Sequence, residues 1–392
     1  MNLVRICLLL IFCSCGSDFS PYGDPVSVLA LPVRPKPEWP LPRWKTAVPE
    51  STGVSIDGLH KINLYAYPVD QKDSKSKGIK TNALVIVRDG KIIFENYDLR
   101  YGPDHIHLTW DISKSILQTL VGITINKGLL QLEDPGYYHL SSLSRDEDHK
   151  KITIRHLLEM ASGLSAMESY EFSSLNSTSM AMLYTKGREN MGEYCSSLPL
   201  KYEPGTNHYL SSCDTNILAL VLKKVYDSQT YSNLPWKELF EPLGIQNATW
   251  ERDRSGTFVG SSYLYLSARD LAKIGYLYLN NGVWDSKNIL PNNWVDLTRT
   301  PGKVYKVSPL KPELSTYNYS LHWYVNTGVP DRGLQQPWPD SPNDVIASYG
   351  KGGHLLFVIP SLDMVVVRFG DDQDSSFDKN YFLKLIKESI VR

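Results

Sequence analysis

The feature that most constrains this chain is the stretch from His107 to Gly122, which reads HLTWDISKSILQTLVG. Its apolar residues recur at spacings of three and four, which predicts a helix with one apolar face. That face comprises Trp110, Ile112, Ile116, Leu117, Leu120 and Val121. Lys114 falls in the first turn of this helix, among apolar neighbours. Because a buried ammonium group is costly unless it has a partner, Lys114 predicts a polar site at the start of a buried helix.

The four residues Asp111-Ile112-Ser113-Lys114 resemble the Ser-x-x-Lys box of serine β-lactamases and penicillin-binding proteins. In that family the serine is the acyl-accepting nucleophile. The lysine, on the same helix face, takes part in the proton transfers. Lys114 and the following Ser115 match the box, but Asp111 occupies the position of the nucleophile. The resemblance therefore implies a hydrolase site whose central residue has been replaced.

A second family box, Tyr-Ser-Ser preceded by Pro-Gly-Thr, has its counterpart in residues 204–215, which read PGTNHYLSSCDT. The two align without a gap. Leu210 then stands where the family has the tyrosine that passes a proton to the leaving group, and Ser212 ends the box. Tyr209 is adjacent, and a local shift of the backbone would bring it into the site instead. Both alternatives stay open at this stage.

The third family box, a cation followed by two small residues on an inner strand, resembles Lys351-Gly352-Gly353. The resemblance implies that these residues help to hold the substrate carboxylate and the oxyanion. Glycines at such a position allow a ligand to come close to the backbone. Taken alone, the segment would be a glycine-rich turn before a strand. The presence of the other two boxes in family order favours the substrate-binding role.

Local patterns support a sheet assembled from distant parts of the chain. Two β-branched runs flank Asp89-Gly90, which predicts a hairpin. Further strands are expected over residues 319–326, 355–359 and 364–369, and a final helix over 377–391. Helices are expected to start at Ser55, Thr153 and Ser267, which are good N-caps, and the one from Thr153 is expected to end at Gly163.

The resemblance extends over roughly residues 50–390 and is similar to the branch that contains class C β-lactamases, esterases and 6-aminohexanoate-dimer hydrolases. It implies an α/β (α+β) fold. In this fold an antiparallel sheet from the N- and C-terminal segments is covered by helices, and a helical subdomain is inserted at roughly residues 135–310. The active site would lie in the cleft between them. The domain itself is expected to span residues 51–392.

The first fifteen residues carry one positive charge and a short apolar run that ends in Cys13-Ser14-Cys15. This resembles a bacterial lipoprotein signal, with Cys15 as the lipidated residue, and the alternative is an ordinary secretory signal. Residues 16–50 are rich in proline and predict an extended tether, although Trp39 and Trp44 indicate that part of it docks. The protein is thus expected in the cell envelope, attached to a membrane only through its lipid.

Composition limits the remaining function classes. The chain has 392 residues, 42% of them hydrophobic, and a formal net charge of −1. This is enough for a large core, and the charge balance does not favour nucleic acid as a partner. Cys195 and Cys213 are the cysteines outside the signal region, and the sequence leaves open whether they pair. No cofactor or metal is expected, and the partner would be a small molecule or peptide in the cleft.

The substitution at residue 111 leads to two functional hypotheses. Attack by an aspartate on an amide would give an anhydride, which is uphill, whereas a carboxylate at residue 111 would pair with Lys114 and hold it in its charged form. The first hypothesis is a family member with impaired catalysis that binds a ligand or acts as a scaffold. The second is an active hydrolase of ester, amide or β-lactam bonds with a rearranged nucleophile. Ser113 would point away from Lys114 around the helix. Ser212 and Ser211 are better candidates for a substitute nucleophile, although the sequence offers no obvious base for either.

Overall fold

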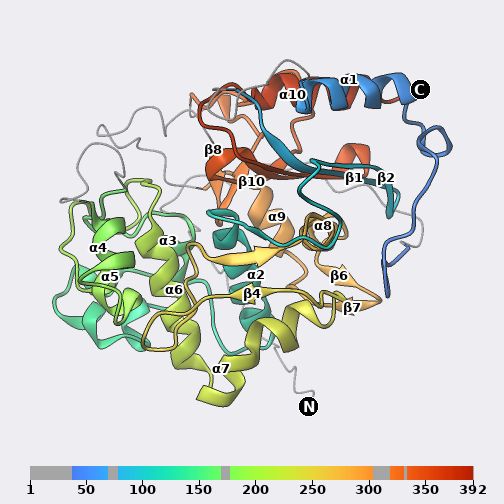
Figure 1. Ribbon diagram of the computed structural model, residues 1–392. Helices are drawn as coiled ribbons and strands as arrows, with labels where there is room; N and C mark the ends of the chain where they lie inside the picture. The colour runs from blue at the N-terminus through green and yellow to red at the C-terminus, as the bar shows by residue number, and fades with distance from the viewer. Residues whose placement is uncertain (1–37, 69–77, 169–176, 303–317, 331–332, 392) are drawn as a thin grey trace, which may run out of the picture.

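The computed structural model describes residues 38–68, 78–168, 177–302, 318–330 and 333–391. Both ends of the chain contribute to one seven-stranded sheet, in the order β2-β1-β12-β11-β10-β9-β8 (Figure 1). All of its neighbouring strands are antiparallel, which confirms the predicted fold class. The strands are β1 (Thr81–Arg88), β2 (Lys91–Tyr97), β8 (Asn318–Ser320), β9 (Trp323–Val325), β10 (Ile346–Gly350), β11 (His354–Ile359) and β12 (Met364–Gly370).

The predicted hairpin at Asp89-Gly90 is confirmed. Both residues have positive φ, 51° and 71°, as a two-residue hairpin turn with a right-handed strand twist requires. The strand that leads into the turn is buried on both faces, because alternate residues enter two separate hydrophobic cores. Val85 belongs to one core and Leu84 to the other. The central sheet therefore needs helices on both sides.

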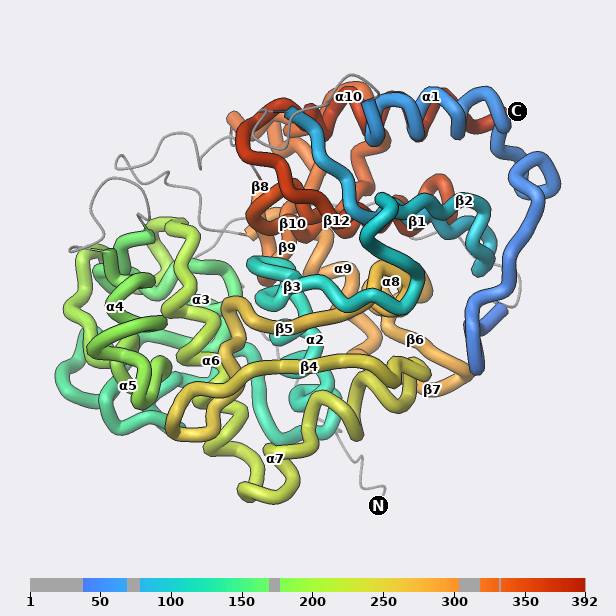
Figure 2. Tube along the Cα trace, viewed as in Figure 1, coloured from blue at the N-terminus to red at the C-terminus, as the bar shows by residue number. Residues whose placement is uncertain are grey.

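Helices cover the two faces of the sheet as this pattern requires. On one face lie α1 (Ile56–Ala66) and α10 (Lys379–Glu388), side by side along the top of Figures 1 and 2. On the other lie α2 (Ile112–Asn126) and α8 (Ala268–Leu279). The hydroxyls of Ser55 and Ser267 accept hydrogen bonds from the third backbone N–H of α1 and α8, so both predicted N-caps are confirmed.

A second lobe, mostly helical, is formed by the middle of the chain and lies to the left in Figure 1. Its helices, with those that link it to the sheet, are α3 (Ile154–Leu158), α4 (Thr178–Tyr184), α5 (Met191–Ser196), α6 (Ser212–Val225), α7 (Ser228–Pro235) and α9 (Trp294–Arg299). Short strands accompany them: β3 (His107–Leu108), β4 (Thr249–Trp250), β5 (Leu264–Leu266), β6 (Val283–Trp284) and β7 (Lys287–Asn288). The helix capped by Thr153 ends at Leu158, earlier than predicted, and Met160 beyond it has a φ of 56°.

Single helical turns complete the fold. They are η1 (Pro49–Thr52), η2 (Gly136–Tyr138), η3 (Ser141–Ser144), η4 (His149–Lys151), η5 (Trp236–Phe240), η8 (Lys351–Gly353) and η9 (Pro360–Leu362). Across residues 38–68, 78–168, 177–302, 318–330 and 333–391, no helix is both long and apolar enough to cross a membrane.

The described part of the proline-rich segment docks on the body of the protein, as its tryptophans predicted. The rings of Trp39 and Trp284 lie 5.1 Å apart, and Trp44 Nε1 donates a hydrogen bond to the Arg269 carbonyl at 2.8 Å. In Figure 2 this segment runs along the right edge of the molecule up to α1. Cys15 and the predicted signal lie outside the described residues.

The structure corrects the prediction that Lys351, Gly352 and Gly353 lie on an inner strand. They form the short turn η8 between β10 and β11. Gly352 and Gly353 have φ values of 75° and 78°, which are incompatible with a strand. A Cβ on Gly353 would lie 2.1 Å from Asp372 Oδ2, so only glycine fits there. The two glycines thus have a structural reason to be present, independent of any ligand.

We predict that Gly353→Ala will destabilise the protein more than Gly128→Ala. Gly128, just after α2, also has a positive φ of 72°, but a Cβ there would meet nothing within 4 Å. Its replacement should cost only the left-handed strain, about 1 kcal/mol. Gly353→Ala adds steric overlap and should cost about 3 kcal/mol or more. Urea unfolding of both variants at one pH measures the difference, and equal losses would contradict this explanation of the turn.

Candidate functional site

The site forms where the first turn of α2 meets the first turn of α6. Lys114 lies in α2 with its side chain 3% exposed, and its ammonium forms an ion pair with the Asp111 carboxylate. The predicted pair is therefore confirmed. Lys114 Nζ also donates to Ser212 Oγ at 3.2 Å and to the Ser261 carbonyl at 3.5 Å. Asp111 is the residue before α2, and its side chain is 43% exposed, so solvent reaches the carboxylate from the open side.

Ser212 lies between a cation and a second carboxylate that the sequence did not reveal. Its hydroxyl is 3.1 Å from Glu168 Oε2, and its backbone N–H donates to Glu168 Oε1 at 2.5 Å. Since Lys114 donates to the same hydroxyl, the Ser212 proton is directed toward Glu168. Ser212 itself is buried, 3% exposed. Glu168 belongs to none of the family boxes quoted from the sequence, so only the folded chain identifies it.

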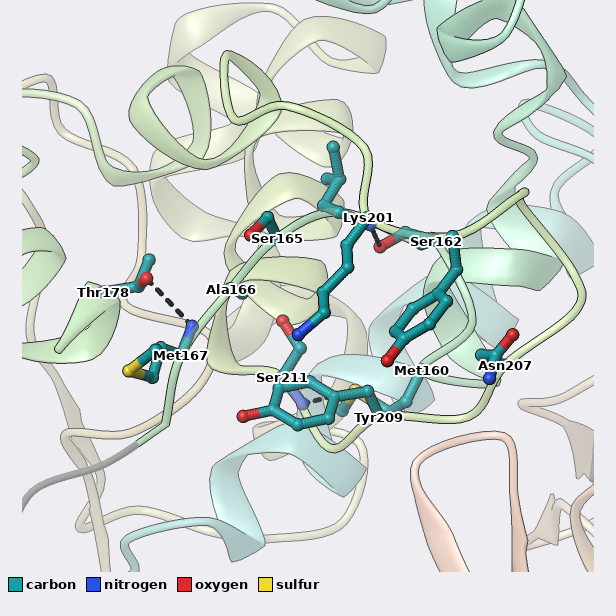
Figure 3. Close-up of a pocket in the computed structure, with 13 residues that line it drawn as sticks. Met160, Ser162, Ser165, Ala166, Met167, Thr178, Lys201, Asn207, Tyr209 and Ser211 are labelled. Atoms are coloured by element: carbon teal, nitrogen blue, oxygen red, sulfur yellow. Dashed lines mark hydrogen bonds between the residues drawn. The ribbon is translucent and has the colours of Figure 1, made fainter. Parts of the chain in front are cut away.

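The structure settles where Tyr209 points. Its hydroxyl accepts a hydrogen bond from the Glu168 backbone N–H at 3.4 Å, and its ring lines a cavity with Met167 and Lys201 (Figure 3). Tyr209 therefore faces this cavity, and Leu210 beside it is half-buried; its assignment to the tyrosine position stays a prediction.

Another tyrosine lies at the edge of the sheet, near enough to Asp111 for their charges to interact. Tyr319, on β8, is almost fully buried. Burial raises the pKa of its phenol well above the ordinary value, and the nearby carboxylates of Asp111 and Asp214 add to this effect. Tyr319 is therefore a neutral phenol close to the cleft carboxylates. Sequence reasoning missed it because it belongs to no box.

The strand next to α2 approaches Asp111 through Gly350. A Cβ on Gly350 would lie 2.9 Å from the Trp110 Cβ and 3.0 Å from the Asp111 backbone nitrogen, so β10 can run this close only with glycine there. Lys351 follows, exposed, with its ammonium 5.4 Å from the centre of the Trp110 ring. Gly350 thus adjoins Asp111 directly, while Gly352 and Gly353 turn away into η8.

The serines around Lys114 have fixed structural partners. Ser113 Oγ lies 2.9 Å from Thr109 Oγ1, away from Lys114 as predicted. Ser115 Oγ lies 2.6 Å from the His322 carbonyl oxygen and 2.7 Å from Ser348 Oγ on β10. These bonds attach α2 to the sheet, whereas the hydroxyl of Ser212 accepts a hydrogen bond from Lys114.

The start of α6 is held from several sides. Ser211 caps the helix, and Cys195 and Cys213 form a disulfide that joins α6 to α5, which answers the question left open by the sequence. Asp214, fully buried, accepts a hydrogen bond from Ser162 Oγ at 2.7 Å. Burial raises the pKa of Asp214 to about 7.

In the described residues no cluster of three or more histidine, cysteine or acidic side chains is arranged to hold a metal.

Comparison with known proteins agrees with this architecture. Residues 69–386 match the Beta-lactamase family, and the chain belongs to that family. It is 21% identical over 304 residues to the 6-aminohexanoate-dimer hydrolase of Paenarthrobacter ureafaciens, covering 75% of this chain and 73% of that protein. It is thus a homologue of beta-lactamase-family hydrolases.

Solved structures share the fold. The chain is similar to EstCE1, a hydrolase with promiscuous acyltransferase activity (TM-score 0.64, 17% identity, 85% of this chain and 98% of that one). It is also similar to a class C beta-lactamase (TM-score 0.60, 16% identity, 85% and 96%). A penicillin-binding protein homologue from Caulobacter crescentus has a TM-score of 0.61 at 11% identity, covering 88% and 99%. At these identities the likeness concerns the fold alone.

We predict that Asp214 makes the stability of the protein fall between about pH 4 and pH 7. Its folded-state pKa, about 7, lies above the ordinary aspartate pKa of 3.8, so the folded state binds the proton more tightly than the unfolded state. The free energy of unfolding should therefore decrease as the pH rises through this window and level off above it. Asp214→Asn should remove this component. Urea unfolding of both proteins across the window measures the difference, and parallel curves would contradict the assignment.

Proposed function

We propose that this protein binds a small molecule or peptide in the cleft of the beta-lactamase fold without forming an acyl-enzyme intermediate at residue 111. One observation carries the proposal: the Asp111 carboxylate at the start of α2 is ion-paired with Lys114. A serine there would yield an ester that water can open, whereas an aspartate would yield an anhydride. A carboxylate beside Lys114 also favours the protonated form of its amine, and a protonated amine cannot accept the proton of a nucleophile.

Leu210 supports the same proposal. When residues 204–215 are aligned with the second family box, this position corresponds to the tyrosine that transfers a proton to the leaving group. The neighbouring Tyr209 faces a separate cavity, and its hydroxyl contacts the Glu168 backbone. Loss of a nucleophile removes most of an enzyme's catalysis, and a residual part can come from binding and oxyanion stabilisation. The scaffold around the cleft would then serve ligand binding or scaffolding.

A second candidate function is hydrolysis with Ser212 as the nucleophile. The specific observation in its favour is the chain Glu168–Ser212–Lys114, in which the Ser212 hydroxyl lies 3.1 Å from a carboxylate oxygen and 3.2 Å from the ammonium nitrogen. A carboxylate can accept the proton of an attacking hydroxyl. Against it stands the burial of Ser212, which leaves little of the residue open to a substrate.

Intact-protein mass spectrometry after incubation with a penicillin or with a p-nitrophenyl ester distinguishes the two candidates. We expect no adduct on the wild type and an acyl adduct on Asp111→Ser, because this change restores a hydroxyl three residues before Lys114. Ser212→Ala serves as the matched variant. A wild-type adduct that Ser212→Ala abolishes would replace the first proposal by the second. Absence of an adduct on Asp111→Ser would contradict a preserved acylation cleft.

We also propose that the protein is exported and lipid-anchored through Cys15. The support is the sequence of residues 1–15, with a charged start, a short apolar run and a terminal cysteine. Cys15→Ala should move the protein from the membrane fraction to the soluble fraction and remove the lipid mass. Cys13→Ala is the matched control and should leave both unchanged. If Cys13→Ala rather than Cys15→Ala has this effect, the anchor position is wrong.

A further inference from the structure

A cavity of about 390 Å³ lies on the helical-lobe side of the cleft, between the segment that follows α3 and the loop that leads into α6 (Figure 3). This volume is typical of sites for small molecules. Met160, Leu164, Ala166 and Met167 give it an apolar lining. The lining includes Ser211 but neither Asp111 nor Lys114, so the cavity is distinct from the position of the family's nucleophile.

The polar part of the cavity lining includes one lysine and two tyrosines. Lys201 and Tyr202 line it from the loop, and Tyr209 lines it from the segment just before α6. The backbone N–H of Lys201 donates to the Gly163 carbonyl at 2.8 Å, which fixes the base of the side chain. Burial raises the pKa of the Tyr209 phenol, so this group is a neutral donor at neutral pH.

The charge at the cavity is positive. The Lys201 ammonium is 5.7 Å from the centre of the Tyr202 ring, and among the described residues it has no carboxylate within ion-pair distance. The two acidic groups nearby in sequence are engaged elsewhere. Glu203 lies 3.8 Å from Lys151, and Glu168 accepts the N–H of Ser212. A ligand in the cavity would therefore meet an ammonium group above an apolar floor.

We infer that this cavity binds a small carboxylate with an apolar or aromatic body, which names the ligand class of the ligand-binding function proposed above and rests on it. The carboxylate pairs with the Lys201 ammonium, and the Tyr209 hydroxyl is in position to donate a hydrogen bond to it. The body packs on Met160, Leu164 and Ala166. The ligand lies one residue away from Ser212, beside the Asp111–Lys114 pair rather than on it.

Isothermal titration calorimetry on the full chain tests this with phenylbutyrate as the probe. Phenylbutanol and phenylbutylamine have the same body without the negative charge. We expect wild type to bind phenylbutyrate more tightly than phenylbutanol or phenylbutylamine. Lys201→Met should weaken the binding of phenylbutyrate by about tenfold, because one charge-assisted hydrogen bond is lost at a partly exposed site. Lys224→Met, an exposed lysine near the end of α6 and outside the cavity, is the matched control and should bind like wild type.

The outcomes separate this inference from the proposed function. Equal binding of the acid and the alcohol, equal weakening in the two lysine variants, or no binding of phenylbutyrate would overturn the inference. The alcohol should bind wild type and Lys201→Met alike, which shows that the variant keeps its fold and its apolar floor. A result that contradicts the proposed function would be seen in another experiment, as a covalent adduct on the wild-type protein in mass spectrometry.

Discussion

The structure of the cleft depends on the compensation of one buried charge, the ammonium of Lys114. An isolated ammonium group inside a protein is strongly unfavourable, and here groups from different parts of the chain compensate it, among them the Asp111 carboxylate, the Ser212 hydroxyl and the Ser261 carbonyl. Satisfying this charge requires α2, α6 and the segment before β5 to meet at one point. The sheet lobe and the helical lobe are joined at that point.

The helical lobe, in turn, fixes the start of α6 more firmly than an ordinary helix start. Ser211 caps the helix, and the Cys195–Cys213 disulfide joins it to α5. Within the first turn, the Asp214 carboxyl group accepts a hydrogen bond from the Ser162 hydroxyl. Glu168 then reaches back to the N–H of the first helical residue. A carboxylate near a helix N-terminus is favourable because it meets free N–H groups and the positive end of the dipole. This arrangement explains why Ser212 is held rigidly yet carries its hydroxyl between two charges.

Sequence patterns predicted the parts of the molecule that local physics determines. The hairpin at Asp89-Gly90, the N-caps Ser55 and Ser267 and the pair of Asp111 with Lys114 depend on residues within four positions of each other. Glu168, Tyr319 and Gly350 could not be found in this way, because what makes each of them relevant is a contact across 40 residues or more of chain. The wrong assignment of Gly352 and Gly353 to a strand has a related cause. Glycine permits both an extended and a left-handed backbone, so the residue type alone does not decide between a strand and a turn.

The two departures from the family pattern are mutually consistent in physical terms. A phenol at residue 210 would be useful only if a basic amine stood ready to exchange protons with it, and the Lys114 amine is engaged by Asp111. Once a carboxylate occupies residue 111, an apolar Leu210 removes a polar group that would otherwise need a partner near the cleft. Tyr209, one residue earlier, instead lines the adjacent cavity with Lys201. Under the proposed function, the loop that has Leu210 at the aligned tyrosine position also supplies one wall of the proposed binding site, which would let this region bind a ligand without acyl transfer.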